Sequence, residues 1–195
     1  MSATHDFKAA KLVNLETRFS GWCKILVATI ALPDGRTFTR EIEDHGRAAC
    51  ILPFDAARKT AIIIRQLRAP VLYAAQRHDL FEAIAGLIDG DTPAAAVKRE
   101  AMEEAGLRLR AVEHVTTSWT MPGLSTERMD LFFAEYTAAD RIAAGGGLAS
   151  EHEDIEVLEM PLRDIAAMID AGRDVDIKLL ALVQTLRLRR PELFA

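Results

Sequence analysis

The segment from Ala85 to Leu107, AGLIDGDTPAAAVKREAMEEAGL, constrains the chain more than any other part of its sequence. Thr92 and Pro93 are typical of a helix start, because a hydroxyl caps the first turn and proline fits the first helical position. Gly106 is a favourable stop, since glycine tolerates the left-handed backbone that ends many helices. The segment therefore predicts a helix between these residues, preceded by a loop that begins at Gly86.

Three carboxylates and a guanidinium occupy one and a half turns of this predicted helix. Glu100 and Glu104 are four residues apart and project from one face, and Glu103 lies one turn from both Glu100 and Arg99. Like charges at this spacing destabilise a bare helix, and a divalent cation between them reverses that effect. Oxygen ligands of this kind suit Mg²⁺, whereas zinc prefers His and Cys. The alternative is a solvated acidic face that binds no ion.

Composition narrows the class of protein further. The chain has 195 residues, 50% of them hydrophobic, which is enough for a full core in one domain with an appendage. A net charge of −5 and the lack of a Lys/Arg tract argue against nucleic-acid and membrane-surface partners. Cys23 and Cys50 are too few for a disulfide framework, and the N-terminal sequence does not resemble a signal peptide. We therefore expect a cytoplasmic protein.

Short apolar segments alternate with turn signals along the chain, as expected for a mixed α/β protein. The expected strands are residues 22–32, 36–43, 48–54, 60–66, 80–85, 107–117, 128–136 and 155–160, and the expected helices are residues 93–105, 162–171 and 176–189. This order predicts an α/β/α sandwich with a mixed sheet. Residues 1–46 are expected to form an N-terminal β-hairpin subdomain, and residues 47–195 the main domain.

The acidic segment resembles the Nudix box, whose pattern is G-x5-E-x7-R-E-U-x-E-E-x-G-U with U aliphatic. Its loop is one residue shorter, with Asp91 where the pattern has glutamate. A wider resemblance includes IIIRQLR (62–68), MPGLSTER (121–128) and AGGGLASEHEDIEVLEMP (144–161). It is to the branch of Nudix hydrolases that includes the ADP-ribose and GDP-mannose pyrophosphatases. In that branch N-terminal strands are exchanged between two subunits, so the resemblance implies a homodimer.

The resemblance also implies roles for individual residues. Glu100 and Glu104 would be the principal metal ligands, assisted by Glu103 and the carbonyl of Ala85. Glu153 would be the catalytic base, flanked by Glu151, and Arg99 would orient a neighbouring glutamate. The substrate would be bound by Arg68 at the diphosphate or the distal sugar, by Glu127 near the terminal sugar, and by Leu87. Arg40 and Phe19 would enclose the nucleotide's base across the dimer. The alternatives are an ordinary surface ion pair for Arg99, loop acids that only aid solubility, and a packing role for Phe19.

The implied activity is hydrolysis of the diphosphate of a nucleoside diphosphate sugar, with Mg²⁺ or Mn²⁺ as cofactor. ADP-ribose, giving AMP and ribose 5-phosphate, is the favoured substrate and GDP-mannose the alternative. Two other classes remain open, a non-catalytic domain that senses a nucleotide sugar and an interaction protein built on an inactive Nudix core.

Overall fold

The computed structural model describes residues 9–148, 150 and 153–195. By internal contacts the chain divides into two compact units. The first, called the N-terminal unit here, runs up to Arg47 and also contains Trp119–Arg128. The second, the core unit, comprises Ala48–Ser118 and Met129–Ala195. The segment 119–128 thus belongs with the N-terminal strands, although it lies far from them in the sequence.

The N-terminal unit is built on a three-stranded antiparallel sheet, β1 (Lys11–Ser20), β2 (Lys24–Ala31) and β3 (Thr37–Asp44). The predicted hairpin corresponds to β2 and β3, joined by a turn in which Gly35 has a φ of +87°. Strand β1 was not predicted. Its pairing with β2 shifts register between Leu12 and Asn14 and again between Thr17 and Phe19. These irregularities remove the strict alternation by which a strand is recognised in a sequence.

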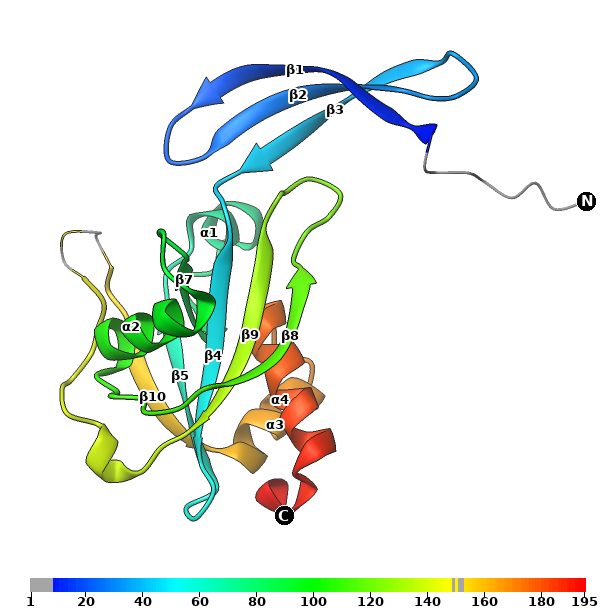
Figure 1. Cartoon of the computed structure of the whole chain (residues 1–195). Coiled ribbons are helices and arrows are strands. Elements are labelled where there is room, and N and C mark those ends of the chain that lie inside the picture. Colours follow the sequence, from blue (N-terminus) through cyan, green and yellow to red (C-terminus); the bar gives the residue numbers. More distant parts are fainter. Residues whose placement is uncertain (1–8, 149, 151–152) are drawn as a thin grey trace, which may run out of the picture. The chain divides into compact units, whose positions relative to one another are not determined.

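The core unit contains a seven-stranded mixed sheet (Figure 1). The order is β10 (Glu156–Pro161), β5 (Thr60–Gln66), β4 (Ala48–Asp55), β9 (Arg128–Glu135) and β8 (Glu113–Trp119), with β6 (Leu80–Glu82) paired to β5 and β7 (Ile84–Leu87) paired to β4. Strand β4 is parallel to β9 and antiparallel to both β5 and β7. All eight residues of β4 are buried, which makes it the centre of the unit.

Helices cover both faces of this sheet (Figure 1). Alternate residues of β4 face opposite sides: Cys50 and Leu52 pack with α3 (Leu162–Asp170) and α4 (Ile177–Arg189), and Ile51 packs with α2 (Pro93–Ala105). Two apolar cores therefore lie on either side of one sheet. The predicted α/β fold with a mixed sheet is confirmed.

The described part of the chain also contains α1 (Ala69–Ala75) and the 3₁₀ turns Ala138–Asp140 and Pro191–Phe194. Helix α1 was not predicted: its seven residues, APVLYAA, are all apolar and none is buried, so no polar positions mark a helical period. The strand expected at residues 107–117 begins only at Glu113. Leu107 instead forms an isolated bridge with Arg141, and the N–H of Arg108 bonds to the carbonyl of Asp140. Among the described residues, no helix is long and apolar enough to cross a membrane.

Candidate active site

Helix α2 has the ends that its sequence predicts. The hydroxyl of Thr92 accepts a hydrogen bond from the N–H of Ala95, and Pro93 is the first helical residue. At the other end Gly106 has a φ of +66°, and its N–H bonds to the last helical carbonyls. Val97 and Ala101 are fully buried in the apolar core on this side of the sheet. Fixed ends and a buried stripe set the direction in which the acidic residues of α2 project.

Two of these acidic residues lie directly against strand β7. Glu104 is only 2% exposed, and its Oε2 accepts a hydrogen bond of 3.3 Å from the N–H of Ala85. The Glu100 carboxylate occupies the space beside Gly86, where a Cβ atom would collide with it. Glycine at position 86 thus leaves room for the close approach of this carboxylate and does not serve an unusual φ. The loop and the two carboxylates form one packed unit.

Arg99 links the glutamates to the loop. Its Nη1 lies 2.7 Å from Oε1 of Glu100 and 3.0 Å from Oε2 of Glu103. Its Nη2 donates a hydrogen bond of 3.1 Å to the carbonyl of Leu87. The carboxylate of Asp91 is 3.8 Å from Nε of the same guanidinium, so an acidic group reaches Arg99 in spite of the shortened loop. Arg99 therefore offsets negative charge and fixes the positions of two carboxylates.

Burial shifts the protonation of the two glutamates that face β7. Removal from water raises the pKa of Glu104 to about 9, and the charges of Glu100 and Glu153 add to this effect. Burial likewise raises the pKa of Glu100 to about 7, against the opposing charge of Arg99. Each charged form lacks a sufficient counter-charge inside the site. A divalent cation would provide one, and shifts of this size are common at functional sites.

The donor set therefore suits a hard divalent cation, because it consists of carboxylate oxygens close to the backbone at Ala85. The described residues contain no cluster of three or more His, Cys, Asp or Glu side chains arranged to hold a metal. In the structure the guanidinium of Arg99 contacts both Glu100 and Glu103. The predicted ligands are thus brought together around an arginine, and their role as metal ligands stays a prediction.

A glycine-rich segment brings Glu153 towards this helix. The N–H groups of Gly146 and Gly147 bond to the carbonyls of Glu104 and Glu103, at 2.8 and 3.2 Å. Gly147 has a φ of +80°, and a Cβ atom there would collide with the side chain of Glu153. The Glu153 carboxylate accepts a hydrogen bond of 2.9 Å from the N–H of Leu148.

This arrangement explains the three successive glycines, whose packing role the sequence did not reveal. They let the chain run across the end of α2, satisfy helix carbonyls that would otherwise lack donors, and direct Glu153 towards Glu100 and Glu104. Its charge acts on both of those glutamates. Glu151, the predicted flanking carboxylate, lies outside the described residues.

Arg68, a predicted substrate ligand, is held by a residue that the sequence analysis missed. Its Nε and Nη2 donate to the two carboxylate oxygens of Glu82, at 2.7 and 3.0 Å. Glu82 is buried and Arg68 is partly exposed. The buried carboxylate therefore fixes the position of a guanidinium that reaches the surface. The signal for Glu82 was an acid inside the apolar run Leu80–Ala85, since a buried carboxylate needs a partner.

Of the other predicted substrate ligands, Leu87 lies on β7 in the core unit, and Arg40, Phe19 and Glu127 lie in the N-terminal unit. Arg40 on β3 pairs with Ala28, whereas Phe19 on β1 pairs with Ile25. Because Ala28 and Ile25 are three positions apart on β2, Arg40 and Phe19 project from opposite faces of this sheet. Within one chain they do not enclose a common ligand. Binding of the nucleotide's base between Arg40 and Phe19 would need these residues from two different chains. This arrangement stays a prediction.

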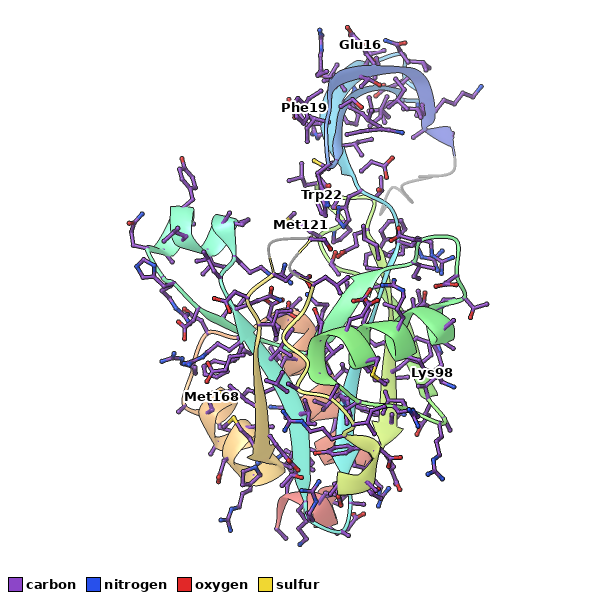
Figure 2. All side chains as sticks on the ribbon, turned by 90° about the vertical axis from the view of Figure 1, so that its left-hand side faces the viewer. Glu16, Phe19, Trp22, Lys98, Met121 and Met168 are labelled. Carbon is purple, nitrogen blue, oxygen red and sulfur yellow. The ribbon has the colours of Figure 1, made fainter. Side chains whose placement is uncertain are left out.

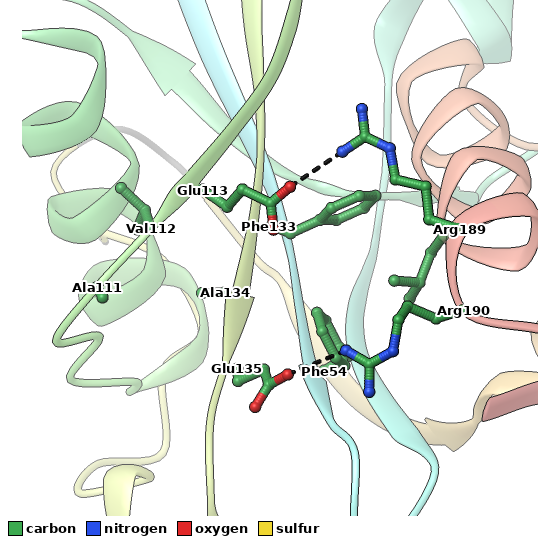
Figure 3. Close-up of a pocket in the computed structure, with 10 residues that line it drawn as sticks. Phe54, Ala111, Val112, Glu113, Phe133, Ala134, Glu135, Arg189 and Arg190 are labelled. Atoms are coloured by element: carbon green, nitrogen blue, oxygen red, sulfur yellow. Dashed lines mark hydrogen bonds and ion pairs between the residues drawn. The ribbon is translucent and has the colours of Figure 1, made fainter. Parts of the chain in front are cut away.

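A separate pocket of about 430 Å³ lies between β8, β9 and the end of α4 (Figure 3). Phe54 and Phe133 line it, and Arg189 and Arg190 form ion pairs with Glu113 and Glu135 on the strands. None of the predicted site residues is among its ten lining residues. Both of its arginines are already paired with carboxylates, so the pocket offers no separate charged group for a ligand.

Comparison with known proteins identifies the family. The model of the NUDIX domain matches residues 44–183. The chain belongs to the Nudix family. It is 40% identical over 151 residues to the GDP-mannose pyrophosphatase of Cronobacter sakazakii, covering 77% of this chain and 78% of the relative. The same enzyme from Escherichia coli O1:K1 is 39% identical over 150 residues, covering 76% and 78%. The predicted Nudix hydrolase, an enzyme acting on acid anhydrides, is confirmed.

Substitution of Gly86 tests the contact between the Nudix loop and helix. Gly86→Ala is expected to lower hydrolytic activity at least about 100-fold, because the new methyl group displaces the Glu100 carboxylate. Turnover and the increase in melting temperature caused by Mg²⁺ are the measurements. Gly123→Ala is the control for stability, because a Cβ atom there meets open space. Unchanged turnover in Gly86→Ala would contradict the importance of this contact.

Proposed function

We propose that the protein is a Mg²⁺-dependent pyrophosphatase that cleaves a nucleoside diphosphate sugar into a nucleoside monophosphate and a sugar phosphate. The observation that carries this proposal is the burial of Glu100 and Glu104 against β7, beside a guanidinium and with Glu153 nearby. Burial and mutual repulsion raise the pKa values of these glutamates, so their charged forms are unfavourable without a bound cation. The burial of these acids is understandable if the site binds cations during catalysis.

The site residues of the core unit have distinct roles in this proposal. Glu100, Glu103, Glu104 and the carbonyl of Ala85 hold the metal, Mg²⁺ or Mn²⁺. When bound, the metal neutralises charge on the diphosphate and makes water easier to deprotonate. Glu153 accepts the proton from the attacking water, and Arg99 keeps Glu100 and Glu103 in position. Arg68, fixed by Glu82, pairs with a phosphate oxygen or the distal sugar.

GDP-mannose is the first candidate substrate. The relatives that cover about three quarters of this chain are named GDP-mannose pyrophosphatases. These names support GDP-mannose over ADP-ribose, which the sequence analysis had favoured. The preference for ADP-ribose stays a prediction for the assay to test. The Nudix box would bind the diphosphate of either compound, and other segments would distinguish the nucleotide's base and the sugar. Glu127, Arg40, Phe19 and Leu87 are the proposed contacts for those groups.

A homodimer is the proposed assembly, and a face of the N-terminal sheet supports it. The strand pairing puts five apolar side chains on one side of β1, β2 and β3, together with Arg40: Leu12, Leu15, Ile30, Phe38 and Ile42. Leu12 and Leu15 are 60% and 49% exposed in the single chain. An apolar face of this kind favours burial against another protein surface. A second copy of this chain is the proposed partner, and a cytoplasmic location remains part of the prediction.

The test is an analysis of reaction products. The protein is incubated with GDP-mannose, ADP-ribose or GTP, with Mg²⁺ or with a chelator, and the phosphate-containing products are separated. We expect GMP and mannose 1-phosphate from GDP-mannose, only when Mg²⁺ is present. Glu104→Gln is expected to be inactive. Glu192→Gln is the matched control, because Glu192 is exposed and forms an ion pair with Arg190 near the C-terminus.

The possible outcomes separate the hypotheses. Cleavage of ADP-ribose alone would reverse the order of the two substrates and leave the reaction class intact. If none of the three compounds were cleaved while GDP-mannose still bound, the sensing function would replace the enzymatic one. Cleavage that persists in the chelator would contradict the metal requirement.

A further inference from the structure

A histidine in the N-terminal unit is enclosed by two carboxylates and an indole. Nδ1 of His45 lies 2.6 Å from Oε1 of Glu43, and Nε2 lies 3.0 Å from Oε1 of Glu127. All three side chains are largely buried. The ring of Trp22 stacks on the imidazole, with centroids 5.1 Å apart and an interplanar angle of 21°. Both ring nitrogens thus face acceptors, which is the arrangement that suits a doubly protonated imidazolium.

The electrostatics agree with this geometry. Burial alone would lower the pKa of His45, but its bonds to Glu43 and Glu127 outweigh that effect and the pKa is raised. Burial also opposes the charge on Glu43, yet hydrogen bonds from Ser125 and His45 bring the pKa of that carboxyl below its usual value. The cluster is therefore most stable when His45 carries a positive charge.

His45 is part of a wider attachment between β3 and the segment 119–128. The N–H of Glu43 bonds to the carbonyl of Leu124, and the N–H of Thr126 bonds to the carbonyl of Glu43. Ser125 and Thr126 also donate their hydroxyl protons to Glu43 and Asp44, at 2.6 and 2.7 Å. Glu127, at the end of this segment, has His45 as a charged partner. The position of its carboxylate thus depends on the imidazole.

We propose that His45 is a positioning residue for recognition of the substrate's sugar, because it holds the Glu127 carboxylate and the segment that carries it in the binding geometry. The proposal rests on the proposed function in one respect, the assignment of Glu127 to the sugar. His45 itself touches no reacting atom. Trp22, 78% exposed, covers one face of the imidazole and lies in the connection between β1 and β2 (Figure 2).

The charge of His45 makes this device sensitive to pH. The titratable and charged groups on the elements around the ring are Glu43 and Asp44 on β3, Glu127 on the segment 119–128, Cys23 beside Trp22, and Lys24 on β2, which is opposite Asp44 in the strand register. When the imidazolium loses a proton, one of its two hydrogen-bond donors disappears and two carboxylates lose their shared cation. Because the pKa is raised, the attachment is intact at low pH and weakens as pH rises through that pKa.

Kinetics of His45→Gln provide the first test. We expect KM for the nucleotide sugar to rise about tenfold, because a charge-assisted hydrogen bond to Glu127 is lost, while kcat changes less than about twofold. In the unaltered protein KM should rise with pH through the His45 titration, and in the variant this rise should vanish. Glu43→Gln should move the midpoint of the rise to lower pH, since one of the two carboxylates that favour the charged ring is removed.

A spectroscopic measurement does not depend on activity or on the variants. In the unaltered protein, a titration followed by nitrogen NMR of the imidazole should give His45 a pKa above the ordinary value of 6.5. A pKa of His45 at or below that value would overturn the proposal. So would a KM profile that keeps its dependence on pH in His45→Gln.

The matched control is His78→Gln, because His78 is an exposed histidine between α1 and β6. Its KM profile should equal that of the unaltered protein, and an equal loss in both variants would overturn the proposal. If the unaltered protein cleaves no nucleotide sugar, the proposed function fails, whereas the nitrogen titration still decides the state of His45. If His45→Gln does not fold, Glu43→Gln and the titration of the unaltered protein carry the test.

Discussion

In the presence of a chelator, Glu104→Gln is expected to raise the melting temperature at neutral pH. Glu104 is 2% exposed and its pKa is raised to about 9, mainly by burial. A carboxyl whose pKa is raised on folding destabilises the protein increasingly as pH rises from its ordinary pKa of 4.5. The cost at pH 7 is up to about 3 kcal/mol, since each pH unit contributes about 1.4 kcal/mol. Its removal should add roughly 3–10 °C.

With Mg²⁺ present the order should reverse. Binding to the folded state alone stabilises by about 2.7 kcal/mol at a concentration one hundred times Kd, and only the protein with Glu104 gains this fully. Thermal melts of both proteins at pH 6, 7 and 8, with and without Mg²⁺, measure the effect. In the chelator the gap between them should widen with pH. The exposed control Glu192→Gln should melt as the unaltered protein does. A variant that melts lower in both conditions would contradict a buried acid that requires a cation.

The sequence was sufficient for helix α2 and the residues around it. Thr92, Pro93 and Gly106 determine the ends of the helix through local backbone chemistry, which acts over a few residues and is therefore readable in the sequence. The short spacing between Gly86 and Glu100, Glu103 and Glu104 follows once the helix is known. Asp91 shows the limit of counting positions, because its carboxylate reaches Arg99 although the loop lacks one residue.

Elements whose pattern depends on packing were predicted less well. Strand β1 was missed because two register shifts disturb its alternation, and one apolar face of it is exposed in the single chain. At residues 107–112 the alternation of leucine and arginine imitated a strand. The backbone there bonds to Asp140 and Arg141 on a distant loop, which no local pattern reveals.

Pairs of residues distant in the sequence were the largest gap in the predicted site. Arg68 was predicted as a ligand of the diphosphate or the distal sugar, but its buried partner Glu82 was not. Glu127 was predicted near the sugar, but its link to His45, 82 positions away, was not. A charged residue can be recognised in one sequence as suitable for a site, whereas the residue that orients it becomes visible only when the fold brings the two together.

The second large effect concerns Glu153 and the glycine that makes room for it. Glu153→Gln is expected to lower kcat by about 10²–10⁴, because the amide cannot accept the proton of the attacking water. KM and the stabilisation by Mg²⁺ should be largely retained, since the glutamates of α2 are unchanged. Gly147→Ala should also lower kcat with Glu153 intact, because the added methyl group displaces that side chain. Measurements of kcat, KM and Mg²⁺-dependent melting separate a base from a ligand.

The control for Gly147→Ala is Gly172→Ala. Both glycines have a left-handed φ, +80° and +77°, but a Cβ atom at Gly172 meets nothing within 4 Å. The two alanine variants therefore share the backbone strain and differ in the contact with Glu153. Equal losses of kcat in both would attribute the effect to strain. A loss in Gly147→Ala alone, matched by Glu153→Gln, would mean that the glycine-rich segment serves catalysis by placing the base. Full activity of Glu153→Gln would exclude Glu153 as the base.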